Sequence, residues 1–193
     1  MASGIHLIPL ARTVRQRWRN DGGWTREIAV DGSRDDWQWR LSLAEVETDG
    51  PFSGFPGIER EIVLIEGAGM AFAFEDGETH ALTPEAPRLR FAGERMLHSR
   101  LLDGPTRDFN LMWRRGQVDA ELWLRPLVGG SVLCAAAGET WGFHLVAGHA
   151  ELTGSGQSLV PGDTLLVQAG DEPLRQHIDA NGSAIVIRLR PAT

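Results

Sequence analysis

The sequence contains one cysteine, Cys134, so it cannot form a disulfide within the chain. The neighbours of Cys134 in SVLCAAAG are small and apolar, which favours a small buried side chain over a nucleophile. No apolar run approaches the roughly 18 residues that a membrane-spanning helix needs. The short apolar segment IHLIPLA lacks a basic leader, so we expect no signal peptide and a cytoplasmic protein.

Acidic residues outnumber basic residues in the sequence. The chain has 19 basic residues against 26 acidic residues, which gives a formal charge of −7. A sequence-independent grip on nucleic acid, or docking on an anionic membrane, requires a basic surface, so we expect neither partner. The length of 193 residues, with 42% hydrophobic and 23% charged residues, fits a globular protein of one large domain or two compact halves.

Clustered metal ligands are also missing from the sequence. None of the six histidines forms a His-x-His pair, and His144 and His149 would lie on opposite faces of a strand. Zinc or iron requires grouped nitrogen and carboxylate ligands. The sequence has no Gly-x-Ser-x-Gly nucleophile elbow, and Gly67-Ala68-Gly69 lacks the third glycine of a dinucleotide site. We therefore expect no metal and no cofactor.

The sequence does contain a series of short strand-like segments. In DWQWRLSLAEV, apolar Trp37, Trp39, Leu41 and Leu43 alternate with other residues, and REIVLIEG and MAFAFEDG flank Gly-Ala-Gly at 67–69 in a hairpin-like pattern. A helical period is weak and occurs only around ERMLHSRLL and LVGGSVLCAAAG. The pattern predicts an all-β barrel or sandwich. Further strand-like segments are RLRFAGE, RDFNLMW, VDAELWL, WGFHLVAGHAEL, DTLLVQAG and SAIVIRLR.

A faint internal repeat indicates two halves. The separation between a proline and a later glycine is nine residues in each half, from Pro84 to Gly93 and from Pro161 to Gly170. Together with the strand count, this repeat predicts two related β-barrel halves. We place them at residues 1–116 and 117–193, and strands could be exchanged between them.

The segment WRNDGGWTREIAV, from Trp18 to Val30, combines a turn with a strand. Asn20-Asp21-Gly22-Gly23 is turn chemistry, because glycine accepts a positive φ and Asn and Asp tolerate one. From Trp24 onward, simple alternation places Trp24, Arg26, Ile28 and Val30 on one face and Thr25, Glu27 and Ala29 on the other. Arg26 then either reaches solvent at the strand end or requires a partner.

Two later strands carry polar residues on one face. Arg40 and Ser42 share a face, and so do Asp108 and Asn110. In a barrel, one face of each strand lines the interior, so these residues would share a lumen. An arginine with hydroxyl and amide neighbours suits a carboxylate, which the guanidinium binds in bidentate fashion.

The same residues allow a purely structural interpretation. Arg40 could form an internal ion pair with Asp108 or Glu45, with no ligand present. The entrance of the lumen would carry Arg26, or Thr25 and Glu27. Glu27 and Glu45 are the weak candidates for a catalytic carboxylate.

Five further motifs follow one another along the chain: NDGGWTREIA (20–29), WRLSLAEV (39–46), DGPFS (49–53), FPGIER (55–60) and DFNLM (108–112). Taken in this order, they resemble the motifs of the HutD/Ves family over roughly residues 5–190. The resemblance implies a cupin-like fold with two β-barrel halves and an association with histidine utilisation, with a proposed role in binding a small acid such as formylglutamate or urocanate. The Ves branch implies a loose link to stress or cold responses. The chain departs from the family at Asp21, where glycine is more frequent, and from metal-binding cupins at Met70, Phe72 and Phe74, where those proteins place histidines.

Three functions are compatible with these residues. The first is a metal-free bicupin that binds a small carboxylate metabolite and acts as a sensor or buffer in histidine utilisation. The second is a metal-independent isomerase or hydrolase that uses Glu27 or Glu45 as a base beside Arg40. The third is a non-catalytic, stress-related interaction protein. The expected ligand-binding residues are Asn20, Thr25, Arg26, Arg40, Ser42, Phe52, Asp108 and Asn110.

Overall fold

The structure is a computed structural model that describes residues 3–33 and 36–192. Within these residues the regular structure is β-strand, apart from one short 3-10 helix, η1 (Leu10–Arg12), which confirms the prediction of an all-β chain with little helix. None of the described residues forms a helix long and apolar enough to cross a bilayer. The chain divides into two compact units, Val14–Arg115 and Met1–Thr13 with Gly116–Thr193, here called the N-terminal and the C-terminal unit.

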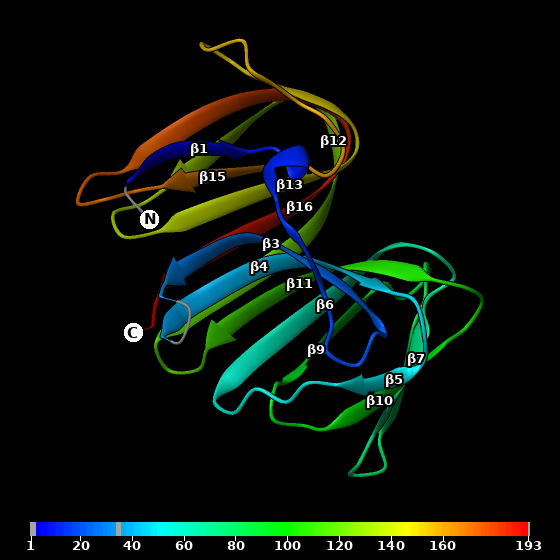
Figure 1. Cartoon of the computed structure of the whole chain (residues 1–193). Helices are drawn as coiled ribbons and strands as arrows, with labels where there is room; N and C mark the ends of the chain where they lie inside the picture. The colour runs from blue at the N-terminus through cyan, green and yellow to red at the C-terminus, as the bar shows by residue number, and fades with distance from the viewer. Residues whose placement is uncertain (1–2, 34–35, 193) are drawn as a thin grey trace. The chain divides into compact units, whose positions relative to one another are not determined.

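The N-terminal unit consists of two antiparallel sheets that enclose an apolar core (Figure 1). The core takes Ile62 and Leu64 from the first sheet and Phe72 and Phe74 from the second. The first sheet has the order β2 (Arg15–Arg17), β3 (Gly23–Gly32), β4 (Trp37–Val46), β11 (Thr106–Arg114), β6 (Ile58–Glu66) and β9 (Arg88–Ala92). The second has the order β5 (Gly50–Phe52), β10 (Leu97–Leu101), β7 (Met70–Phe74) and β8 (Thr79–Leu82).

The C-terminal unit is built on one strongly curved antiparallel sheet, which incorporates the first strand of the chain. Ile5 of β1 pairs with Val167 of β15, so the N-terminal segment completes this unit rather than the one that follows it in sequence. The core of the unit includes Phe143, Leu145 and Leu165. The sheet order is β1 (Gly4–Ile8), β15 (Thr164–Gln168), β13 (Thr140–Leu152), β16 (Leu174–Pro191) and β12 (Val118–Ala135), with β14 (Ser158–Leu159) paired to β13.

Strand β11 is central in the first sheet, and its register confirms the predicted alternation. Asn110 lies opposite Ser42 of β4 and Ile62 of β6, whereas Phe109 lies opposite Leu43 and Val63. Because side chains of directly opposite residues point to the same side of a sheet, Asn110 and Ser42 share a face. The polar positions of β4 and β11 therefore lie together, as the sequence predicts.

The predicted alternation along β3 is wrong beyond Glu27. The pairing with β4 shifts between Glu27 and Ala29, so that Glu27 lies opposite Ser42 and Val30 lies opposite Arg40. A bulge inserts one extra residue and reverses the side to which later side chains point. Val30 consequently shares a face with Thr25 and Glu27, and not with Arg26.

Both segments with a weak helical period are strands. In β10, Leu97 and Ser99 are buried while His98 and Arg100 are exposed, which is the period of two of a half-buried strand. The second segment continues β12 through Ala135. Cys134 is exposed there and not buried, because it occupies the outward side of this strand.

The segment at 67–69 is not a hairpin turn. Strand β6 pairs with β9 and β11, whereas β7 pairs with β8 and β10, so the chain passes here from the first sheet to the second. Gly67 and Gly69 adopt φ values of 94° and 102°. A Cβ atom on Gly69 would lie 1.9 Å from the carbonyl oxygen of Leu82. The crossing therefore depends on glycine at this position.

We expect Gly69→Ala to destabilise the protein far more than Gly77→Ala. Both glycines have a positive φ, but nothing lies within 4 Å of a Cβ atom on Gly77. Gly77→Ala should lose about 1–2 kcal/mol of unfolding free energy from backbone strain alone. Gly69→Ala adds a clash with backbone and should lose about 4 kcal/mol or more. Urea unfolding of both variants measures the difference, and equal losses would contradict the proposed close approach.

Candidate functional site in the N-terminal unit

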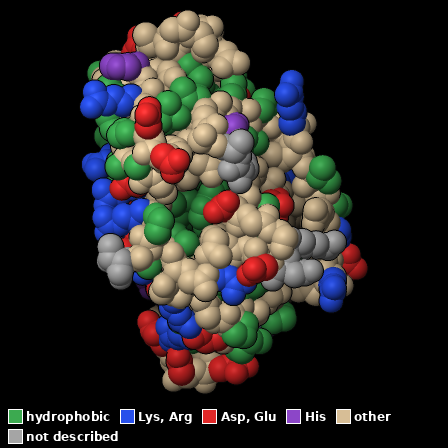
Figure 2. Space-filling model, turned by 90° about the vertical axis from the view of Figure 1, so that its left-hand side faces the viewer, with side chains coloured by type: hydrophobic (Ala, Val, Ile, Leu, Met, Phe, Trp, Pro, Cys, Tyr) green, Lys and Arg blue, Asp and Glu red, His purple; other side chains and the backbone are tan. Residues whose placement is uncertain are grey.

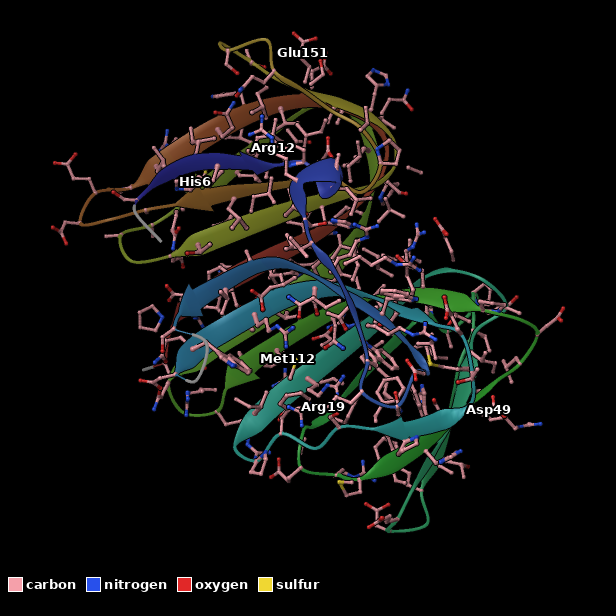
Figure 3. All side chains as sticks on the ribbon, in the orientation of Figure 1. His6, Arg12, Arg19, Asp49, Met112 and Glu151 are labelled. Carbon is pink, nitrogen blue, oxygen red and sulfur yellow. The ribbon has the colours of Figure 1, made fainter. Side chains whose placement is uncertain are left out.

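A cavity of about 1180 Å³ lies in the N-terminal unit. Figure 3 labels two of its lining residues, Met112 on β11 and Arg19 in the connection between β2 and β3, which come from segments far apart in the sequence. On the face that Figure 2 shows, acidic and basic side chains are interspersed, and apolar side chains reach the surface between them. Six predicted ligand-binding residues line the cavity: Asn20, Thr25, Arg40, Ser42, Phe52 and Asn110.

One wall of the cavity is formed by the segment from Gln16 to Asn20. The indole nitrogen of Trp18 donates a hydrogen bond of 2.7 Å to Thr25 Oγ1, and its ring meets Phe52 edge-on with 6.0 Å between centroids. Asn20 Oδ1 accepts a hydrogen bond of 3.1 Å from the amide of Gly22. Asp21 adopts a φ of 55°, the conformation that its more frequent glycine counterpart adopts without strain. The predicted turn thus holds this wall in place.

Glu27 and Arg40 form an ion pair within the cavity. Arg40 Nε lies 2.9 Å from Glu27 Oε2, and both residues line the cavity. The sequence allowed Arg40 to pair with Asp108 or Glu45, and the structure gives it Glu27 instead. One of the two candidate catalytic carboxylates is therefore beside Arg40.

Arg26 and Glu45 lie away from the cavity. Arg26 Nε is 3.6 Å from Glu45 Oε1, and neither residue is among those that line the cavity. Alternation along β3 sends Thr25 and Glu27 to one side of the sheet and Arg26 to the other. The structure thus does not bring these two predicted site residues to the site.

Arg60 is a charged residue of the cavity lining that was not among the predicted site residues. It lines the cavity, yet only 5% of the residue is exposed. Its guanidinium lies 5.3–5.5 Å from the ring centroids of Phe52, Phe55 and Phe91, and its Nη1 donates to the carbonyl oxygen of Ser53 at 3.3 Å. Burial lowers the pKa of Arg60 to about 10, so it remains a cation at neutral pH. Alternation with the apolar residues of REIVLIE was the signal that could have identified it.

Asp108 is completely buried and is not among the residues that line the cavity. Its direct neighbours across β11 are Ala44 and Leu64, which offer no side-chain donor. Among the described residues, neither carboxyl oxygen has a hydrogen-bond partner. Burial raises the pKa of Asp108 to about 7, and the charge of Arg60 opposes this rise only in part.

The residues around the cavity do not fit a metal ion. Among the described residues, its lining contains no histidine or cysteine, and Glu27 is the one carboxylate. Met70, Phe72 and Phe74 are buried in the apolar core. Nowhere in residues 3–33 and 36–192 do three or more His, Cys, Asp or Glu side chains form a group that could hold a metal. The cationic side chains in the cavity would further disfavour a metal cation.

Comparison with known proteins places this chain among a defined set of relatives. A sequence model of the HutD family matches residues 10–186. An uncharacterized 21.2 kDa protein in the hutC 3′ region of Pseudomonas putida is 34% identical over 178 residues, or 89% of this chain and 91% of that protein. Protein Ves of Escherichia fergusonii is 36% identical over 107 residues, or 54% of this chain and 56% of Ves.

Solved structures extend the likeness to the fold. The structure of HutD from Pseudomonas fluorescens SBW25 has a TM-score of 0.84 and 31% sequence identity, and the match covers 98% of this chain and 100% of that one. The bacterial pirin YhhW from Escherichia coli has a TM-score of 0.69 at 13% identity, over 98% of this chain and 100% of that one. The latter likeness concerns the fold alone, and it confirms the predicted cupin-like architecture.

We expect Asp108→Asn to stabilise the protein, and more so at pH 8 than at pH 5. A folded-state pKa of about 7 lies above the unfolded value of about 3.9, so the folded protein holds more protons between these values. The contribution of the Asp108 carboxyl group to the free energy of unfolding is therefore fully present at low pH and is lost as the pH rises through 7. From pH 8 to pH 5 the wild-type protein should gain about 2–3 kcal/mol that Asp108→Asn does not gain.

Denaturant unfolding at the two pH values measures this difference. Asp179→Asn is the matched control, because Asp179 is exposed and the same substitution there should leave the pH dependence of stability unchanged. If the free energy of unfolding depended on pH in the same way in the wild-type protein and in Asp108→Asn, the prediction that burial raises the pKa of Asp108 would be wrong.

Proposed function

The chain belongs to the HutD family, and from this premise we propose that it is a metal-free bicupin that binds a small carboxylate metabolite in the cavity of the N-terminal unit. The observation that carries the proposal is Arg60. A guanidinium that is 95% buried requires a compensating charge, but among the described residues its Nε has no hydrogen-bond partner and its Nη1 donates to the neutral carbonyl oxygen of Ser53. The carboxylate of a ligand in the cavity would supply that charge.

The aromatic surroundings of Arg60 favour recognition of a planar anion. Phe52, Phe55 and Phe91 lie around the guanidinium. Within the described chain, the guanidinium donates one hydrogen bond, to the carbonyl oxygen of Ser53. The remaining N–H groups at the edge of the guanidinium are free to bind a carboxylate in bidentate fashion. Water-poor surroundings strengthen such a pair, because the effective dielectric constant is lower there.

The cavity as a whole is cationic, although the protein is acidic. The described lining residues include four arginines and one carboxylate, Glu27, while the whole chain has a net charge of −7. A cleft lined by one sign of charge concentrates ligands of the other sign. Small-ligand sites also combine apolar walls with a few polar groups, and Ser42 and Asn110 provide such groups here. The arginines are Arg17, Arg19, Arg40 and Arg60.

We assign the ligand to histidine utilisation as an acid of the kind that the family resemblance implies, such as urocanate or formylglutamate. The name of the family and the position of the Pseudomonas putida relative near hutC support this assignment. We infer a sensing or buffering role, because the site would hold an anion by charge and shape while Glu27, the one carboxylate among its described lining residues, is already paired with Arg40.

We expect Arg60→Met to weaken binding of the correct acid by about 10- to 150-fold. The substitution removes a charge-assisted pair, which contributes about 1.5–3 kcal/mol, while methionine retains contact with the surrounding rings. Calorimetric titration with urocanate, formylglutamate and formate measures the effect. Arg95→Met is the matched control, because Arg95 also lies over a phenylalanine ring, 3.9 Å from the centroid of Phe74, but does not line the cavity.

The control variant should bind as tightly as the wild-type protein. Melting of both variants without ligand separates binding from folding, because an arginine that serves only the fold would change the melting temperature and leave the affinity intact. Wild-type protein that binds none of the three acids would remove the basis of the proposed function.

A second candidate function is a metal-independent isomerase or hydrolase with Glu27 as general base. The observation in its favour is the Glu27–Arg40 pair at 2.9 Å in the cavity wall. If Glu27 is a catalytic base, the protein should convert one of the acids, and Glu27→Gln should lower kcat by about 100-fold or more. Chromatography of each acid after incubation with both proteins tests this. Unchanged acids would leave binding as the function.

A further inference from the structure

Asp108 is a charged position without local support. It belongs to the central strand β11, and the residues directly opposite it on the two neighbouring strands are the apolar Ala44 and Leu64. The cavity does not reach it, and its oxygens accept no hydrogen bond within the described chain. A sealed carboxylate in such surroundings is costly when ionised and inexpensive when protonated.

The charge of Arg60 is the favourable influence on ionised Asp108. Both residues project to the interior side of the first sheet, from β6 and β11, and the two charges attract each other there. Other titratable or charged side chains on the interior faces of the two sheets are Arg40 on β4, Glu27 on β3 and His80 on β8, which lies opposite the core residue Phe72. Arg40 and Glu27 already form a pair with each other. Arg60 is therefore shared between Asp108 and whatever anion enters the cavity.

We propose that binding of a carboxylate to Arg60 places one proton on Asp108. This inference rests on the proposed function of the same site, and it makes Asp108 a positioning residue that acts through Arg60. A ligand carboxylate adds a second negative charge to one buried cation, and two anions cannot both be compensated by it. Asp108 is the one that can become neutral in place, by taking a proton from solvent, and no other bond forms or breaks.

The direction of the pH effect follows from this coupling. Below pH 7 Asp108 already carries its proton, because burial holds its pKa at about 7, so ligand binding needs no further proton. Above pH 7 each binding event must add one, and the affinity falls as the pH rises. With a pKa of about 7 in the free protein and a much higher one in the complex, the affinity at pH 8 should be about tenfold lower than at pH 6.

The test is calorimetric titration of the full chain with formate and with benzoate at pH 6, 7 and 8. Both acids stay fully ionised over this range, so the ligand contributes no titration of its own. At pH 8, titrations in phosphate and in Tris, which differ in ionisation enthalpy, should report an uptake approaching one proton for each bound anion. Asp108→Asn is neutral at every pH, so it should take up no proton and should bind at pH 8 about as tightly as the wild-type protein binds at pH 6.

His80→Gln is the matched control, because His80 is a histidine on the core side of β8, directly opposite Phe72. It should keep the tenfold pH dependence. Binding without pH dependence in the wild-type protein, or the same dependence in Asp108→Asn, would overturn the proton coupling and leave carboxylate binding intact. If His80→Gln lost the pH dependence of the affinity, the titrating group would be His80 and not Asp108, and the proposal would be wrong. Failure of both acids to bind at any pH would overturn the coupling and the binding function together.

Discussion

A buried guanidinium is the constraint around which the N-terminal unit is arranged. Arg60 stands on the same face of β6 as Ile62 and Leu64, which are core residues, so its charge is directed into an apolar interior. The chain supplies partial compensation from three phenylalanine rings, one carbonyl oxygen and the distant charge of Asp108. A cation held in this way is costly for folding and well suited to binding an anion, because the described chain compensates its charge only in part.

The architecture makes this arrangement possible by giving β11 two buried faces. One face carries Phe109 and Leu111, and the other carries Asp108 and Asn110. Because β11 pairs with both β4 and β6, its polar face lies beside Ser42 on one side and on the face of Arg60 on the other. A central strand thus brings together, within one sheet, polar residues from three segments of the chain that are far apart in sequence. The same strand places a titratable carboxyl group where solvent cannot stabilise its charge.

Prediction from the sequence was most successful where a local pattern has one physical solution. The alternation in 37–46 and 106–114 allowed the polar faces to be identified, because a strand has a side-chain period of two. Prediction was unsuccessful where the pairing of one strand with another set the direction of a side chain or the course of the chain. A bulge at Ile28 reversed the side of Val30, and the glycine break at 67–69 proved to be a passage between sheets. Arg60 was not predicted as a site residue, because an arginine between two glutamates, Glu59 and Glu61, is typical of an exposed surface segment.

The sequence by itself determined the strand content, the turn at Asn20–Gly23 and the pairing of polar faces, since each depends on residues within a few positions of one another. Only the tertiary structure decided which charges meet. Arg40 pairs with Glu27 and Arg26 with Glu45 because the register of β3 against β4 sets the distances. Arg60 and Asp108 are both buried on one face of the first sheet, where each feels the charge of the other without direct contact, because β6 and β11 pair although they are not consecutive in the chain. Ion pairing acts between side chains over a few ångströms, and separation along the sequence carries no information about that distance.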